Sequence, residues 1–138
     1  MVPGDPEPNR VYFNRGAGRP FEHRTEDVFG SIPDLARVIK ARDLDGDGLT
    51  DIFVGTTYQT QSRLFLGTGR GAFDEHTGTH LPQEPLSLGD AEPGDVDGDG
   101  DLDLVLADWG PGNNMRNAGG AARFFWSWVV TDRNVGIK

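Results

Sequence analysis

Two short segments of the chain carry aspartates at alternate positions. In the first segment, aspartates stand at loop positions 1, 3, 5 and 9, glycine at position 6, and a backbone carbonyl is available at position 7; these residues are Asp43, Asp45, Asp47, Asp51, Gly48 and Leu49. The second segment repeats the pattern with Asp95, Asp97, Asp99, Asp103, Gly100 and the carbonyl of Asp101. Ca²⁺ takes about six to eight oxygen ligands, and alternate carboxylates on a tightly turning backbone converge on one point. We therefore expect each loop to bind one Ca²⁺, which gives two sites.

Other interpretations of these loops fit less well. An EF-hand needs a bidentate glutamate at position 12 and a helix on each side, but position 12 is Val54 in the first loop and Leu106 in the second, each within an apolar run typical of a strand. Mg²⁺ demands a stricter octahedral geometry and keeps its waters. A solvated acidic turn without metal is the remaining alternative. The repeated spacing favours metal, because four carboxylates crowded into one loop repel each other unless a cation neutralises them.

The chain repeats itself at a period of 52 residues. The segment Asp43–Ile52 matches Asp95–Leu104. A second landmark is an apolar strand followed by two glycines and a phenylalanine; it occurs at Arg10–Phe13 with Gly16, Gly18 and Phe21, and again at Arg63–Leu66 with Gly69, Gly71 and Phe73. A third pass is expected at Asn114–Asn117 with Gly119, Gly120 and Phe124, but it lacks the apolar triplet. We therefore divide the chain into a repeat over about 9–61, a second over about 62–113 and a partial third over about 114–138.

Short apolar runs separated by glycine, proline and aspartate predict an all-β fold. The expected strands are Val38–Ala41, Ile52–Gly55, Arg63–Leu66, a weaker one from Phe73, and Leu104–Ala107. Pro33–Lys40 is compatible either with a helical turn or with entry into a strand. Four strands in about 50 residues is the size of one blade of a β-propeller. The expected architecture is a partial β-propeller of about two and a half four-stranded blades.

The pattern D-x-D-G-D-G-x-x-D followed by an apolar strand resembles the FG-GAP/VCBS repeat of integrin α-subunit propellers and many bacterial surface proteins. The strand R-[VL]-[YF]-[FL] with its following glycines and phenylalanine is similar to repeats of the cartilage-acidic-protein/UnbV-like subgroup. The resemblance covers residues 9 to 124 approximately. It implies that the cation ties a loop between adjacent strands of a blade, and that a complete propeller has about seven blades.

A propeller blade must bury its faces against neighbouring blades, and two and a half blades leave apolar faces and strand edges open. We therefore expect further blades of a parent chain or self-association, and we interpret the sequence as a fragment of a larger protein. The expected role is a scaffold or binding surface for a protein or carbohydrate ligand, without enzymatic activity; part of a carbohydrate-active propeller enzyme is the alternative. Millimolar calcium outside cells suits such sites, so we expect an extracellular, periplasmic or cell-surface location.

Composition narrows the partners further. The net charge of −9 argues against nucleic acid and against docking on anionic membranes, and no apolar run is long enough to cross a bilayer. With no cysteine, the chain has no disulfide and no thiolate site.

Three further groups of residues were candidates for function. His76 and His80 have the spacing of a metal pair, but Thr77-Gly78-Thr79 between them predicts a loop. Gly67–Gly71 superficially resembles a phosphate loop and is expected to be a hairpin turn. Trp109, Trp126 and Trp128 are candidates for stacking on a sugar, although packing between blades is the preferred interpretation.

Overall fold

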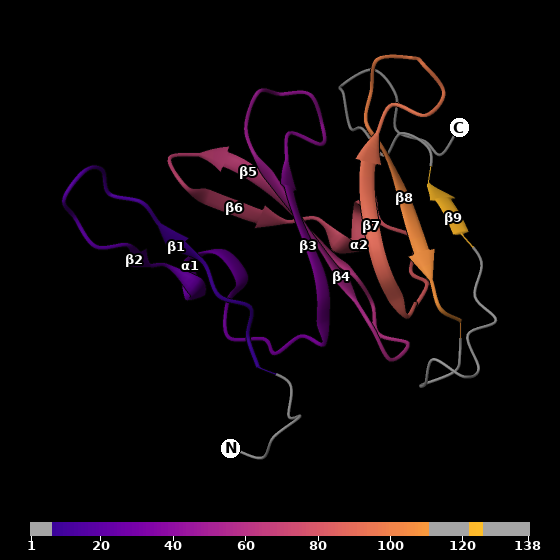
Figure 1. The fold of residues 1–138 in the computed structure, drawn as a ribbon, viewed down its shortest axis with the longest axis horizontal. Helices are drawn as coiled ribbons and strands as arrows, with labels where there is room; N and C mark the ends of the chain where they lie inside the picture. Colours follow the sequence, from indigo (N-terminus) through magenta and orange to yellow (C-terminus); the bar gives the residue numbers. More distant parts are fainter. Residues whose placement is uncertain (1–6, 111–121, 126–138) are drawn as a thin grey trace.

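The computed structural model describes residues 7–110 and 122–125. These residues form three antiparallel sheets, none of them closed, which follow one another in chain order (Figure 1). The elements, in order, are β1 (Tyr12–Phe13), β2 (Glu22–His23), α1 (Thr25–Phe29), β3 (Ala36–Arg42), β4 (Asp51–Thr56), β5 (Arg63–Gly69), β6 (Ala72–Glu75), α2 (Thr77–His80), β7 (Leu88–Gly94), β8 (Asp103–Asp108) and β9 (Ala122–Phe125). The all-β prediction is confirmed.

The three sheets differ in completeness. An N-terminal sheet pairs β1 with β2, a central sheet has the order β3-β4-β5-β6, and a third sheet has the order β7-β8-β9. The prediction of four strands within about 50 residues is therefore confirmed in the central sheet, which runs from Ala36 to Glu75. Among the described residues, neither helix is long and apolar enough to cross a membrane.

The expected strands are all present, but the prediction for one connecting segment was wrong. Of the two possibilities for Pro33–Lys40, the strand is the one that forms, because β3 begins at Ala36. Thr77-Gly78-Thr79, expected to be a loop, begins the helical turn α2, in which the amide of Leu81 donates to the Thr77 carbonyl. The Thr77 hydroxyl accepts a hydrogen bond from the Leu64 amide at 3.0 Å. This tertiary contact outweighs the weak helix propensity of the segment.

The 52-residue period of the sequence reappears in the backbone pairing. Ala36 pairs with Thr56 in the central sheet, as Leu88 pairs with Asp108 in the third, and each ladder then has a bulge at the next residue. The register continues to Arg42 opposite Asp51 and to Gly94 opposite Asp103. The β3–β4 and β7–β8 hairpins are therefore two copies of one unit.

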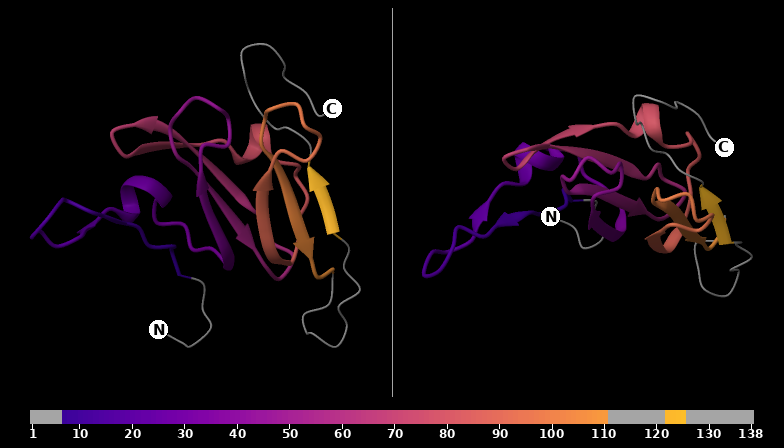
Figure 2. Two further views of the ribbon diagram at one scale, coloured as in Figure 1. Left: turned by 45° about the horizontal axis from the view of Figure 1, so that its top comes forward. Right: turned by 90° about the horizontal axis from the view of Figure 1, so that it is seen from above.

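The N-terminal sheet is a partial copy of the same unit. The Val11 amide donates to the Thr25 hydroxyl at 3.2 Å, as the Leu64 amide donates to the Thr77 hydroxyl. The amide that precedes each threonine donates to the carbonyl of the same strand residue, Val11 or Leu64. The segment β1-β2-α1 thus corresponds to β5-β6-α2, the outer half of the central sheet (Figure 2).

The third copy of the strand landmark was predicted too early in the sequence. Its expected start, Asn114–Asn117, lies outside the described residues. In the third sheet, Arg123 pairs with Leu106 in the register in which Arg63 pairs with Val54 in the central sheet. Phe124 therefore takes the pairing position of Leu64, and the prediction that it corresponds to Phe73 was wrong. The glycines that suggested the earlier start do not define the pairing register.

The central sheet is apolar on both faces. Side chains alternate along a strand, so Phe53 and Leu64 pack toward the third sheet, whereas Val54 and Phe65 pack toward the N-terminal unit. Phe53 and Val54 are both completely buried. This two-sided burial explains why β4 and β5 are continuous apolar runs rather than alternating ones.

A buried ion-pair network joins β5, β6 and the segment before β3. The guanidinium of Arg63 donates to Glu75 through Nε at 2.9 Å and Nη2 at 3.0 Å, and to Asp34 through Nη1 at 2.8 Å. The side chains of Arg63 and Asp34 are each only 8% exposed. The Arg63 guanidinium holds the pKa of the Glu75 carboxyl below its usual range. Arg10, the repeat counterpart of Arg63, is exposed and forms only a 3.4 Å contact with Glu7.

We predict that Arg63→Ala lowers the free energy of unfolding by about 3–5 kcal/mol, because removing one partner leaves the Asp34 carboxylate buried without its cation. The measurement is urea unfolding followed by circular dichroism. Arg10→Ala is the matched control and should change stability by less than about 1 kcal/mol, the usual range for an exposed pair. Equal losses in the two variants would contradict a structural role for the buried network.

Candidate metal centre

Both aspartate loops connect the first two strands of a sheet and lie at the same end of the molecule. The first loop joins β3 to β4 and the second joins β7 to β8 (Figure 1). Because the two hairpins share one register, their loops leave the sheets in the same way. The repeat therefore sets the two groups of carboxylates at one end.

The same hydrogen bonds shape the two loops. Asp43 accepts from the amides of Gly46 and Gly48, both at 2.8 Å. In the second loop, Asp95 accepts from Gly98 at 2.8 Å and Gly100 at 3.0 Å. All four glycines have a positive φ, between 79° and 98°, a conformation that a residue with a Cβ rarely adopts. The glycines thus allow the backbone to fold around the first aspartate of each loop.

Three carboxylates come together in each loop. One oxygen from each of Asp43, Asp45 and Asp51 lies within 4.8 Å of the others, and the same is true of Asp95, Asp97 and Asp99. Oxygens that surround Ca²⁺ at 2.3–2.6 Å are at most about 5 Å apart. The donor set is composed of hard oxygens, and its span fits a calcium ion.

The remaining predicted ligands lie beside these clusters. Asp47 accepts from the Leu49 amide at 2.7 Å, and Asp103 accepts from the Val96 amide at 2.9 Å. Neither aspartate belongs to the cluster of its own loop. The carbonyls of Leu49 and Asp101 stay predicted ligands; the Asp101 amide donates to Asp99 at 3.0 Å.

Asp51 has a structural task that the sequence did not reveal. Its side chain is completely buried. One oxygen accepts from the Leu44 amide at 2.7 Å, and the other accepts from the Gly67 amide of β5 at 2.9 Å. A Cβ on Gly67 would lie 2.3 Å from the Thr50 carbonyl oxygen, so this close approach requires glycine. Asp51 therefore ties the loop to the neighbouring strand.

The electrostatics of the loops reflect crowding and burial. Burial, together with the nearby charges of Asp51 and Asp47, raises the pKa of Asp45 to about 6. Burial also raises the pKa of Asp51, although three backbone amides oppose this effect. In the second loop, desolvation and then the charges of Asp99 and Asp103 raise the pKa of Asp97. A bound divalent cation would offset these unfavourable charges.

Residues 43–106 match the family described as FG-GAP-like repeat. This segment, slightly less than half of the chain, is similar to the FG-GAP-like repeats. The matched segment begins after β3, at the first aspartate of the first loop, and continues through β4, β5, β6, α2, β7 and the second loop into β8. The resemblance expected from the aspartate spacing is confirmed for this segment, whereas the cartilage-acidic-protein/UnbV-like subgroup stays a prediction. Neither the curated proteins nor the solved structures give a significant match.

Two other candidate groups have structural roles in or beside the repeat. Gly67–Gly71 belongs to the β5–β6 hairpin, as expected: Gly67 and Gly69 pair with Phe73 and Ala72, and Arg70, with a positive φ of 56°, and Gly71 form the turn. Trp109 packs between the bulge of β3 at Arg37 and the bulge of β7 at Gly89. The Arg37 guanidinium lies 4.7 Å from its ring centroid, and a Cβ on Gly89 would come within 2.2 Å of its Nε1. This position matches the preferred interpretation of Trp109 as a packing residue. Trp126 and Trp128 lie outside the described residues.

His76 and His80 stack edge to face, with ring centroids 4.8 Å apart. His80 is 6% exposed, and its Nδ1 lies 2.7 Å from the Thr79 hydroxyl. Its buried Nε2 has no hydrogen-bond partner among the residues that the structure describes. Burial, and then the charge of His76, lowers the pKa of His80. The pair is packed into the fold rather than presented to a ligand.

We predict that His80 makes the chain less stable in acid. Its folded-state pKa lies below the ordinary value of about 6.5, so its contribution is fully present above that value and is lost as the pH falls through the folded-state pKa. The measurement compares urea unfolding of the wild type and His80→Gln from pH 8 to pH 5, in chelator. The wild type should lose stability relative to the variant as the pH falls. A constant difference between the two proteins would contradict the prediction.

Proposed function

We propose that the chain is a calcium-binding repeat module, part of a β-propeller, that serves as a scaffold or binding surface for a protein or carbohydrate ligand. The observation that carries this proposal is that a cluster of three carboxylates occurs in each of two loops at the same place in the sheet. Both clusters contain the aspartates of loop positions 1 and 3, and the third member is Asp51 of position 9 in the first loop and Asp99 of position 5 in the second. A single acidic turn is common on protein surfaces. Two equivalent turns at a fixed repeat distance favour a shared ligand.

Each loop would hold its ion through carboxylate oxygens, with Asp43, Asp45 and Asp51 in the first and Asp95, Asp97 and Asp99 in the second. The ion supplies positive charge that offsets the repulsion within the loop. The loop amides orient Asp43 and Asp95 in advance, and Asp51 ties the first loop to β5. A pinned loop would hold the connection between β3 and β4, or between β7 and β8, in one conformation.

The half-sheet formed by β1, β2 and α1 supports the place of this module in a larger array. It reproduces the outer half of the central sheet, so the corresponding inner strands would come from further blades of a parent chain or from another copy. We propose an extracellular, periplasmic or cell-surface location, where calcium is abundant enough for sites of this kind. The proposed role is binding rather than catalysis, and the acidic surface disfavours nucleic acid as a partner.

The experiment is isothermal titration of the chelator-treated chain with calcium, combined with thermal unfolding. We predict two calcium ions per chain for the wild type and one for either Asp43→Asn or Asp95→Asn. At a free calcium concentration of about 100 times the dissociation constant, one site adds about 2.7 kcal/mol to the free energy of unfolding.

Asp74→Asn is the control, since this exposed aspartate lies on β6 outside both loops. It should keep both ions and the full calcium-dependent rise in melting temperature. No binding heat in the wild type, together with equal melting temperatures in calcium and chelator, would refute the proposed function.

A further inference from the structure

The two loops have the same internal structure but different surroundings. Leu44, which follows the first aspartate of the first loop, is 9% exposed and belongs to the core, whereas its counterpart Val96 is 46% exposed. Asp45 is half-buried, whereas its counterpart Asp97 is exposed. The first loop is therefore in contact with the packed interior, and the second is open to solvent on this side.

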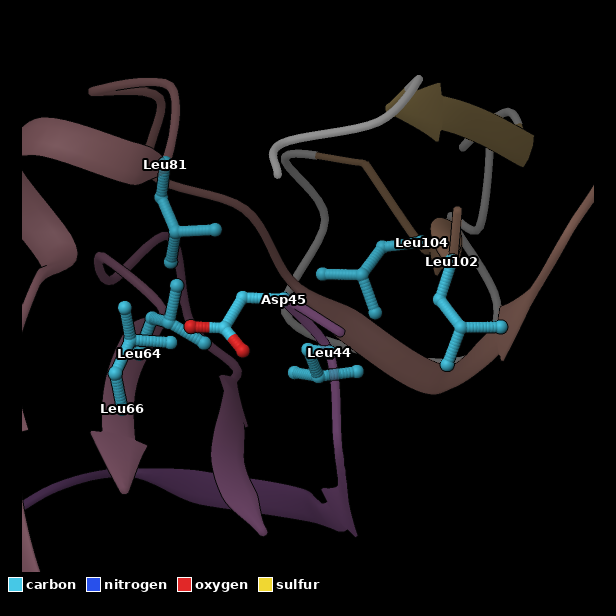
Figure 3. Close-up of a pocket in the computed structure, with 7 residues that line it drawn as sticks. All are labelled: Leu44, Asp45, Leu64, Leu66, Leu81, Leu102 and Leu104. Atoms are coloured by element: carbon cyan, nitrogen blue, oxygen red, sulfur yellow. The ribbon is translucent and has the colours of Figure 1, made fainter. Parts of the chain in front are cut away.

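The carboxylate of Asp45 points into a crevice between the central and third sheets (Figure 3). Apart from Asp45, the described residues that line this crevice are all leucines: Leu44, Leu64, Leu66, Leu81, Leu102 and Leu104. Leu44 belongs to the first loop, Leu64 and Leu66 to β5, and Leu81 follows α2. Leu102 precedes β8 and Leu104 lies in it, so the leucines come from two successive sheets and their connections. The space between them is small, about 20 Å³, which is room for one water molecule.

A charged carboxylate in such a crevice is unfavourable, because leucine side chains offer no hydrogen bond to replace water. The described contact of the Asp45 carboxylate is with its own loop, where it accepts from the Asp47 amide at 3.1 Å. The same carboxylate lies within 4.8 Å of oxygens of Asp43 and Asp51. Asp45 is thus shared between an apolar crevice and a candidate cation site.

We propose that the first loop is a calcium-dependent clasp between the central and third sheets: when the loop binds calcium, Asp45 turns from the leucine crevice toward Asp43 and Asp51, and the leucines of the two sheets close on one another. This inference rests on the proposed function, since it requires calcium in the first loop. It adds that the two sites differ, because Asp97, the counterpart of Asp45, is exposed. Calcium in the first loop should tighten two sheets, and calcium in the second should order its own hairpin.

Two matched variants separate the loops, since Asp45 and Asp97 are repeat counterparts. Asp97→Asn isolates the first site and Asp45→Asn isolates the second. The probe is calcium alone, with binding followed by titration calorimetry and packing followed by amide hydrogen exchange with mass spectrometry. Peptides that cover Leu64–Leu66 and Leu102–Leu104 report on the two sides of the crevice.

In Asp97→Asn, calcium should slow amide exchange about tenfold or more on both sides of the crevice. In Asp45→Asn, calcium should slow exchange only within 95–108. If Asp97→Asn binds calcium but its protection stays within 43–51, or if both variants protect the two sheets equally, the clasp is refuted while calcium binding stands. An absence of binding heat in the wild type refutes both the clasp and the proposed function.

A measurement without calcium tests the crevice itself. In chelator, Asp45→Asn removes a charge from apolar surroundings, so its melting temperature should rise above that of the wild type by about 4 °C. Asp97→Asn removes an equivalent charge from an exposed position and should produce a smaller rise. Equal rises in the two variants would show that repulsion within the loops, and not the crevice, governs Asp45, and would overturn the clasp.

Discussion

The structure depends on burial of both faces of the central sheet. Phe53 and Leu64 on one face, and Val54 and Phe65 on the other, are nearly or completely removed from water. Neither face can be left exposed without losing a large share of the hydrophobic free energy. The chain covers each face with a copy, or part of a copy, of the same unit. The row of sheets is therefore a consequence of an apolar surface that needs neighbours on both sides.

This row also determines where the charge accumulates. Sheets that share one strand register carry their β3–β4 and β7–β8 loops to the same end, which concentrates the aspartates there. Between β3 and β7, opposite charges attract instead of repelling. Lys40 of β3 forms an ion pair with Glu92 of β7, with 3.0 Å between nitrogen and oxygen. These two residues occupy equivalent positions of the repeat. Because one copy of the repeat has a lysine where the next has a glutamate, the two adjacent sheets attract each other at this position.

Features that depend on residues close together in the sequence could be predicted. Features that depend on contacts between distant residues could not. Strands and aspartate loops could be predicted because apolar runs and carboxylate spacing are visible within ten residues. The helical turn α2 could not, since the Thr77 hydroxyl is held by Leu64, which lies 13 residues away. The pairing of Arg63 with Asp34 joins residues 29 apart, and only the recurrence of arginine at the start of the strand hinted at a role. The third pass was misplaced because pairing with β8, not the turn glycines, sets its register.

Equal sequences in a repeat array do not imply equal sites. The two loops share their aspartates, glycines and internal hydrogen bonds, yet the surroundings of Asp45 are decided by Leu102 and Leu104, which belong to the next repeat. Under the proposed clasp, a ligand in the first loop would therefore act on packing that the following repeat provides. Because contacts in such arrays run between neighbours, the energy of a site reflects its place in the row as well as its own residues. On the proposal made above, such a module would bind the same ion twice: in the first loop the ion would link two sheets, and in the second it would order one hairpin.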